Sequence, residues 1–290
     1  MTAEAQRKTR VGCVYRPEFP PEKLAAAARS ADAAGVDELW LWEDCFLSGG
    51  ISAAAIALSH SEHLTVGVGV LPAPMRNVAL TAMEIATLSR SFPGRVRIGV
   101  GHGVQDWMGQ IGVRVASPMT FLREYLTCLR ALLGGESVTY TGRYVALSDV
   151  QLQWPPAPDI EMLAAATGPR TLQLAGELAT GTVLTGGTTP TQVRTAIGQI
   201  GAAGPHSVVV YLPCAIGANA QALIQREIQH WEFDETADVA VYGEPAEIAV
   251  AARRWVDAGA DTVVLQPTAE ADIHRFFDTV GTEIRPLLQR

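Results

Sequence analysis

The sequence lacks the residues that hold small domains together covalently or through a metal ion. Its four cysteines, Cys13, Cys45, Cys128 and Cys214, are spread over 290 residues without a C-x-x-C pair, which argues against a disulfide framework and a zinc knuckle. No H-E-x-x-H motif occurs either. We therefore expect free thiols and no metal site.

Basic residues are outnumbered by acidic ones. The chain has 22 Lys and Arg against 30 Asp and Glu, a formal charge of −8, and its two lysines are Lys8 and Lys23. This sign opposes a function that depends on neutralising nucleic-acid phosphates. We expect no nucleic-acid partner.

Long apolar runs are absent as well. No run reaches the roughly 18 residues of a membrane helix, and the charged stretch at residues 7–10 is not followed by the apolar segment of a signal peptide. These absences predict a cytoplasmic protein with no membrane contact. The 48% hydrophobic content is enough for the core of one domain spanning residues 1–290.

Short β-branched runs alternate with Ala-rich segments of helical spacing, a pattern typical of parallel strands joined by crossover helices. Eight such units fit a (β/α)₈ TIM barrel better than an open doubly wound sheet with an added domain. We expect helices to start near Pro21, Ser52, Asn77, Pro118, Pro169, Pro190, Asn219 and Glu244. The expected strands are residues 11–15, 38–42, 64–70, 95–100, 161–165, 182–184, 208–212 and 262–265.

Residues 138–145 read as a hairpin-like stretch, followed by a Pro cluster at residues 154–158. We interpret both as an insertion between the fourth and fifth barrel strands. No linker divides the chain and no internal repeat is present.

The active site of a TIM barrel lies just beyond the C-terminal ends of its strands. His102, between two glycines after the fourth strand, is the histidine best placed for chemistry, against the alternative of a structural role. Cys45 is a candidate nucleophile, although a structural thiol is the simpler interpretation. The glycines around Gly101 would let a flat ring approach the backbone.

Thr167, Gly168, Pro169 and Arg170 follow the fifth strand and open a helix. Backbone N–H groups and the positive end of a helix can hold a phosphate there. A tight barrel turn with Pro at the first helical position explains the same residues without a ligand. Both interpretations stay open on the residues alone. After the sixth strand comes Thr185, a further candidate at the mouth.

Several segments together resemble the bacterial luciferase-like superfamily. They are residues 33–44, 64–72, Arg76 with 82–88, 92–103, and 168–172 with 179–181. The resemblance spans nearly the whole chain in the right order. It implies a barrel that binds FMN or the deazaflavin coenzyme F420 at its C-terminal mouth and transfers hydride equivalents.

The Val-Gly-Val-Leu-Pro stretch looks closer to the deazaflavin-dependent branch, which includes glucose-6-phosphate dehydrogenase and methylenetetrahydromethanopterin reductase. The resemblance implies a non-prolyl cis peptide at Gly69-Val70 behind the ring, with Asp44 at the rim of the ring. We expect the phosphate of such a cofactor at the helix start at residues 167–170, because backbone N–H groups, the helix dipole and Arg170 converge there.

The chain departs from the sugar-phosphate enzyme of that branch at three places. Cys45 and Val104 stand where its His and Glu would be, and Thr188 replaces its Lys. We therefore expect a different substrate, apolar or planar, near Trp42, Trp107 and Met108. His102 is the first candidate proton donor, because an imidazole with an ordinary pKa near 6.5 suits proton transfer. Asp44, Gln105 and Asp106 are weaker candidates.

The predicted function is thus an F420-dependent oxidoreductase acting on an unsaturated C=C or C=N bond of a small molecule. One alternative is an FMN-dependent monooxygenase, which would need a flavin reductase partner. Another is a flavin-binding barrel without catalysis. A homodimer is compatible with all three.

Overall fold

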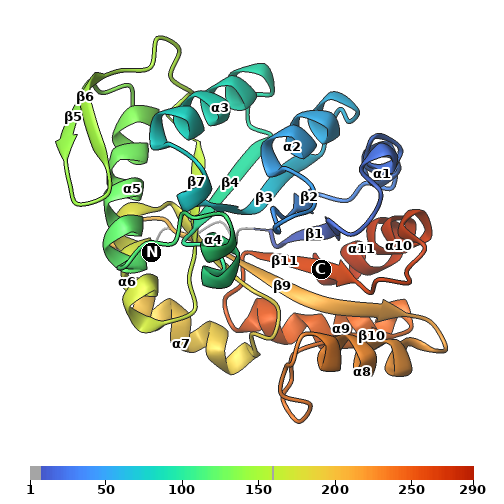
Figure 1. The fold of residues 1–290 in the computed structure, drawn as a ribbon. Coiled ribbons are helices and arrows are strands. Elements are labelled where there is room, and N and C mark those ends of the chain that lie inside the picture. Colours follow the sequence, from blue (N-terminus) through green and yellow to red (C-terminus); the bar gives the residue numbers. More distant parts are fainter. Residues whose placement is uncertain (1–7, 159) are drawn as a thin grey trace, which may run out of the picture.

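The computed structural model describes residues 8–158 and 160–290, and within them eight parallel strands close into a barrel surrounded by helices (Figure 1). β8 pairs with β9 and so closes the ring, with Leu184 opposite Val210. The barrel strands are β1 (Arg10–Tyr15), β2 (Glu38–Leu41), β3 (Thr65–Pro72), β4 (Val96–Gly101), β7 (Glu161–Ala165), β8 (Gly181–Leu184), β9 (Ser207–Ile216) and β11 (Thr262–Pro267).

The predicted (β/α)₈ barrel is confirmed, and each expected strand overlaps a barrel strand. The largest difference is at β9, which continues four residues beyond the expected end at Leu212. There it pairs with an additional short strand, β10 (Val241–Gly243), that lies outside the closed ring.

The helices begin within a few residues of the expected positions, in several cases with Pro in the first turn, where its missing N–H costs no hydrogen bond. Asn77 caps α3 by accepting from the N–H of Ala79. The helices are α1 (Leu24–Ala33), α2 (Gly50–Ser59), α3 (Val78–Ser91), α4 (Gln105–Gln110), α5 (Pro118–Leu133), α6 (Pro169–Leu178), α7 (Pro190–Ile200), α8 (Ala220–His230), α9 (Pro245–Asp257), α10 (Ile273–Thr279) and α11 (Arg285–Leu288).

The expected insertion between the fourth and fifth barrel strands is confirmed. It contains a two-stranded antiparallel sheet of β5 (Val138–Thr141) and β6 (Ala146–Val150). This hairpin stands outside the ring of helices, beside α5 (Figure 1). Glu124 of α5 ties it down by accepting backbone N–H bonds from Arg143, Tyr144 and Val145.

Side chains inside the barrel follow the period of two along each strand. In β2, Trp40 points inward and packs with Tyr211 of β9, whereas Leu39 and Leu41 pack outward against helices. The large indole fits because the strand next to it has Gly67, where a Cβ would collide with the Trp40 ring.

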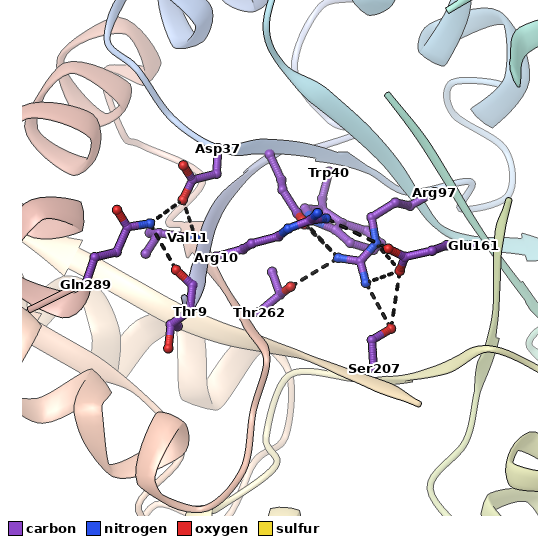
Figure 2. Close-up of polar contacts among 11 residues, drawn as sticks. Thr9, Arg10, Val11, Asp37, Trp40, Arg97, Glu161, Ser207, Thr262 and Gln289 are labelled. Carbon is purple, nitrogen blue, oxygen red and sulfur yellow. Dashed lines mark hydrogen bonds and ion pairs between the residues drawn. The ribbon is translucent and has the colours of Figure 1, made fainter. Parts of the chain in front are cut away.

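A polar network fills the N-terminal end of the barrel (Figure 2). Arg97, 3% exposed, donates to Glu38 at 2.9 Å, and also pairs with Glu161 at 2.7 Å. Its remaining N–H groups reach Ser207 and Thr262, each on a different strand. Buried charges persist only when paired and hydrogen-bonded, so this end of the barrel is a structural element.

No helix in the described part of the chain is both long and apolar enough to cross a bilayer.

Candidate functional site

A cavity of about 480 Å³ opens at the C-terminal ends of the barrel strands. It lies at the end opposite the Arg97 network, where the fold places catalytic sites. Its walls come from residues in or just after seven of the barrel strands, from α4 and from the loop after α8. The residues lining it are Trp42, Glu43, Asp44, Gly69, Val70, Pro72, Gly101, His102, Gly103, Val104, Gln105, Trp107, Ala165, Thr185, Gly186, Tyr211, Trp231, Phe233 and Gln266.

Most of the site residues expected from the sequence face this cavity. They are Trp42, Asp44, Gly69, Val70, Gly101, His102, Trp107 and Thr185. The peptide bond between Gly69 and Val70 is cis, as the family resemblance implied, and so is the bond between Cys45 and Phe46.

Six expected residues lie outside the cavity, namely Met108, Cys45 and the four residues of the turn at 167–170. Met108 is fully buried and packs under Gly103 and Pro72, because consecutive residues of a helix point about 100° apart and Trp107 takes the cavity side. Cys45 lies in the turn after β2, with its sulfur 3.4 Å from the Met75 sulfur.

The environment of Cys45 also weakens its case as a nucleophile. Burial, together with the nearby carboxylates of Glu43 and Asp44, raises the pKa of the thiol. The reactive thiolate is therefore disfavoured.

The expected phosphate-binding turn lies beside the cavity. Ala165 at the end of β7 lines the cavity, but Thr167, Gly168, Pro169 and Arg170 do not. Gly168 caps α6 without a side-chain hydrogen bond, and a Cβ there would meet open space. Arg170 is exposed. A phosphate at this turn stays a prediction.

Sequence reasoning missed four lining residues, Tyr211, Trp231, Phe233 and Gln266. Tyr211 lies within an expected strand, where the sequence does not mark it as a site residue. Trp231 and Phe233 belong to the loop after α8, which contains no motif. Phe233 lies directly over Gly187, where a Cβ would come 2.8 Å from its ring.

Backbone forms much of the cavity floor. Four lining residues are glycines: Gly69, Gly101, Gly103 and Gly186. A Cβ on Gly101 would lie 2.9 Å from the Val70 side chain. Gly103 has φ +70°, a conformation that disfavours other residues. A flat ligand can thus lie against main chain here.

Aromatic rings form one wall. The ring of Trp42 packs edge-on between Tyr211, at 5.7 Å and 81°, and Trp231, at 6.1 Å and 84°. The indole N–H of Trp231 donates to Glu227 at 2.7 Å. The indole nitrogen of Trp42 is buried within this wall.

Arg16 supports this wall from below. Its guanidinium is 1% exposed and lies 5.9 Å from the centre of the Trp231 ring. It pairs with Glu227 at 2.5 Å and with Glu18 at 2.9 Å, and it donates to the carbonyl oxygen of Pro267. One arginine is therefore shared by two carboxylates.

Asp44 is a titratable residue in the cavity wall. Burial, with a smaller contribution from Glu18, raises its pKa to about 6, although Arg16 opposes the shift. Residues 8–158 and 160–290 provide no hydrogen bond or ion pair to its side chain. A carboxyl group in this state can change protonation near neutral pH.

Glu43, the neighbour of Asp44, has a carboxylate that already has protein partners. Its carboxylate accepts from the N–H of Gly50 at the start of α2 and pairs with Arg76. Arg76 also pairs with Glu84 at 3.3 Å. The second arginine beside the cavity thus also carries two carboxylates.

His102 lies on the exposed rim of the cavity. Its Nδ1 is 2.9 Å from the carbonyl oxygen of Gly103, and the Gln105 side chain donates to the His102 carbonyl oxygen. The other ring nitrogen has no partner among the described residues. No group of three or more metal-ligating side chains occurs in the part of the chain that the structure describes.

Comparison with known proteins identifies the family. Residues 4–283 match the luciferase-like monooxygenase family. The chain belongs to this family. Among its relatives, 5,10-methylenetetrahydromethanopterin reductase from Methanolobus tindarius is 28% identical over 270 residues, covering 90% of this chain and 77% of the relative. An F420-dependent glucose-6-phosphate dehydrogenase from Kineococcus radiotolerans is 24% identical over 322 residues, covering 94% of each chain.

Solved structures share the fold over almost the full chain. Coenzyme F420-dependent tetrahydromethanopterin reductase from Methanopyrus kandleri has a TM-score of 0.82 and 20% identity, covering 96% of this chain and 99% of its own. An FMN complex of a type II Baeyer-Villiger monooxygenase from Pseudomonas putida has a TM-score of 0.75 and 14% identity, covering 97% and 98%. The family and fold expected from the sequence are both confirmed.

Proposed function

We propose that this luciferase-like protein is an F420-dependent oxidoreductase, which transfers hydride between the deazaflavin and a small organic substrate. The observation that carries the proposal is the cavity at the barrel mouth, with its glycine floor and aromatic wall. The two relatives described above, one a reductase and one named as F420-dependent, support this choice of cofactor.

The cavity fits a flat heteroaromatic ring. Gly69, Val70 and Gly101 offer main chain for the ring to lie on, and added side chains there would collide with neighbours. When bound, the deazaflavin would supply the hydride chemistry.

The chain's own residues would orient the reactants and exclude water. Val70 and Gly101 would support the ring, while Trp42, Trp107 and Phe233 would cover the reacting face with apolar surface. Asp44 and His102 are the groups we propose to exchange protons with a neutral substrate. Arg170 and the start of α6 would hold the cofactor phosphate.

Native mass spectrometry of the protein from a deazaflavin-producing host tests the cofactor. We expect the mass of F420 to co-purify. Co-purification of FMN would instead favour a monooxygenase with a reductase partner. Titration with purified F420 provides a second readout, in which Gly101→Ala should weaken binding at least tenfold. Gly198→Ala on α7 is the matched control, because a Cβ there meets nothing within 4 Å. Equal affinities of the two variants would contradict the placement of the ring.

A further inference from the structure

The charged side chains around the cavity have a net negative charge. Arg16 and Arg76 flank the cavity, and each is paired with two glutamates. Each group of three therefore leaves an excess of one carboxylate. Since both arginines are already engaged, neither is available to a ligand.

The residues that line the cavity are also more acidic than basic. Its lining contains no Lys or Arg within the described part of the chain, but it contains Asp44. The Asp44 carboxylate has no hydrogen-bond or ion-pair partner there, in contrast to Glu43 beside it. A partly buried carboxylate without a partner favours a ligand that brings an N–H group or a positive charge.

The aromatic wall favours the same ligand. Five of the lining residues are aromatic: Trp42, Trp107, Tyr211, Trp231 and Phe233. Trp42 is nearly perpendicular to both Tyr211 and Trp231, so the three rings form a corner. Aromatic faces attract cations through the ring quadrupole, most strongly when water is excluded.

We propose that the substrate bound in this cavity is a planar molecule with a cationic nitrogen, an iminium or aromatic ammonium-type group, held by Asp44 and the corner of Trp42, Tyr211 and Trp231. The proposal rests on the proposed function and names its substrate class. Phosphorylated and carboxylated substrates are disfavoured, because they would meet uncompensated carboxylates.

This substrate class also matches the absence of the family's acid and base at Cys45 and Val104. Hydride from the reduced deazaflavin would add to the carbon of a C=N⁺ bond, and the π electron pair of that bond would move to nitrogen. The substrate gains two electrons and becomes a neutral amine, so it needs no proton in this step. The deazaflavin would be oxidised by loss of this hydride and of the proton on its ring nitrogen, which would pass to solvent.

Equilibrium binding of three bicyclic probes tests the proposal without turnover. The probes are 1-methylquinolinium chloride, neutral quinoline and quinoline-6-carboxylate, compared by isothermal titration calorimetry at pH 8. We expect the cation to bind at least tenfold more tightly than quinoline, and the carboxylate more weakly than either. Equal affinities, or a preference for the carboxylate, would overturn the proposal.

Asp44→Asn should remove the preference for the cation. We expect the affinity for 1-methylquinolinium to fall about tenfold and the affinity for quinoline to stay within twofold of the wild-type value. Asp106→Asn is the matched control, because Asp106 has the same charge, is 92% exposed and does not line the cavity. Loss of the preference in both variants alike would overturn the assignment to Asp44. If Asp44→Asn fails to fold, the three probes on the wild-type protein still decide.

Binding of oxidised F420 to the same preparations separates this inference from the proposed function. F420 binding without a cation preference would overturn the substrate class and leave the oxidoreductase. A cation preference without F420 binding would support the recognition of cations and contradict the cofactor.

Discussion

The hydroxyl of Tyr211 donates a hydrogen bond to the carbonyl oxygen of Gly69 over 3.2 Å, joining β9 to β3 across the top of the barrel interior. Tyr211 is 2% exposed, and burial raises its pKa well above the usual value, so the phenol stays protonated and remains a donor. A Cβ on Gly69 would collide with this hydroxyl. The two residues therefore hold the segment at Gly69 and Val70 in place together.

This contact predicts strong coupling between substitutions. Tyr211→Phe should cost about 1–2 kcal/mol in the free energy of unfolding, because a buried acceptor loses its donor. Gly69→Ala should cost about 2 kcal/mol or more through overpacking. In the double variant the missing hydroxyl makes room for the methyl group, so we expect its cost to fall at least 1 kcal/mol below the sum. Urea unfolding of the four proteins measures this, and strict additivity would contradict the contact.

The barrel was predictable because each strand and helix carries its own local signal. Much of the site was predictable for a related reason, since any polar residue just after a strand reaches the mouth. Asp44 follows this rule and lines the cavity. Cys45 comes one residue later, in a turn beyond the end of β2, and does not line the cavity. The sequence alone could not show where this turn directs its side chain.

The missed part of the site depends on tertiary contacts. Trp231 reaches the cavity because its indole bonds to Glu227, which in turn pairs with Arg16 more than 200 residues away. Phe233 lies over Gly187 for similar reasons of packing. A loop after a helix carries no sequence pattern that fixes such distant partners.

Removing the charge at the N-terminal end of the barrel should destabilise the protein strongly. Arg97→Met would remove the main ion-pair partner of Glu38, which is fully buried. We expect the free energy of unfolding to fall by about 3–5 kcal/mol. Arg123→Met is the control, because Arg123 pairs with Glu177 on the surface with both side chains about half exposed. Its loss should stay under about 1 kcal/mol. Similar losses in a urea unfolding series would contradict a structural role for the network.

The raised pKa of Asp44 predicts a pH-dependent stability difference. Its folded value is about 6, above the ordinary 3.8, so the folded state holds the proton more tightly than the unfolded chain. Its favourable contribution is complete below about pH 4 and lost as pH rises through 6. Asp44→Asn should therefore match wild type at pH 4 and exceed it by about 1–2 kcal/mol above pH 7, after allowance for partial exposure. A stability difference between the two proteins that does not change with pH would show that folding does not raise the pKa of Asp44.

His102 should matter only for substrates that need a proton. Hydride addition to a neutral double bond leaves an anion, whereas addition to a cationic C=N bond gives a neutral amine. We expect His102→Ala to lower turnover of a neutral substrate about 10²-fold, but turnover of a cationic one less than threefold. F420 affinity should stay within a few fold of wild type. Equal losses on the two substrates, measured by deazaflavin absorbance, would refute this division.

The start of α6 offers a direct test of the cofactor's position. The start of α6, with the exposed Arg170 in its first turn, follows Ala165 of the cavity wall within a few residues, in a protein of net charge −8. A phosphate there would gain from both the helix end and the arginine. We therefore expect Arg170→Glu to weaken F420 binding at least tenfold, about 1.4 kcal/mol.

Arg29→Glu on α1 is the control for this last substitution, since it makes the same change in net charge at another exposed position. It should leave F420 affinity within twofold. The loss for Arg170→Glu should also shrink as salt rises from 50 to 500 mM, because screening weakens an exposed charge pair. Fluorescence titration of both variants at the two salt concentrations measures these effects. An equal loss in the two variants would mean that the overall charge, rather than the α6 turn, governs binding.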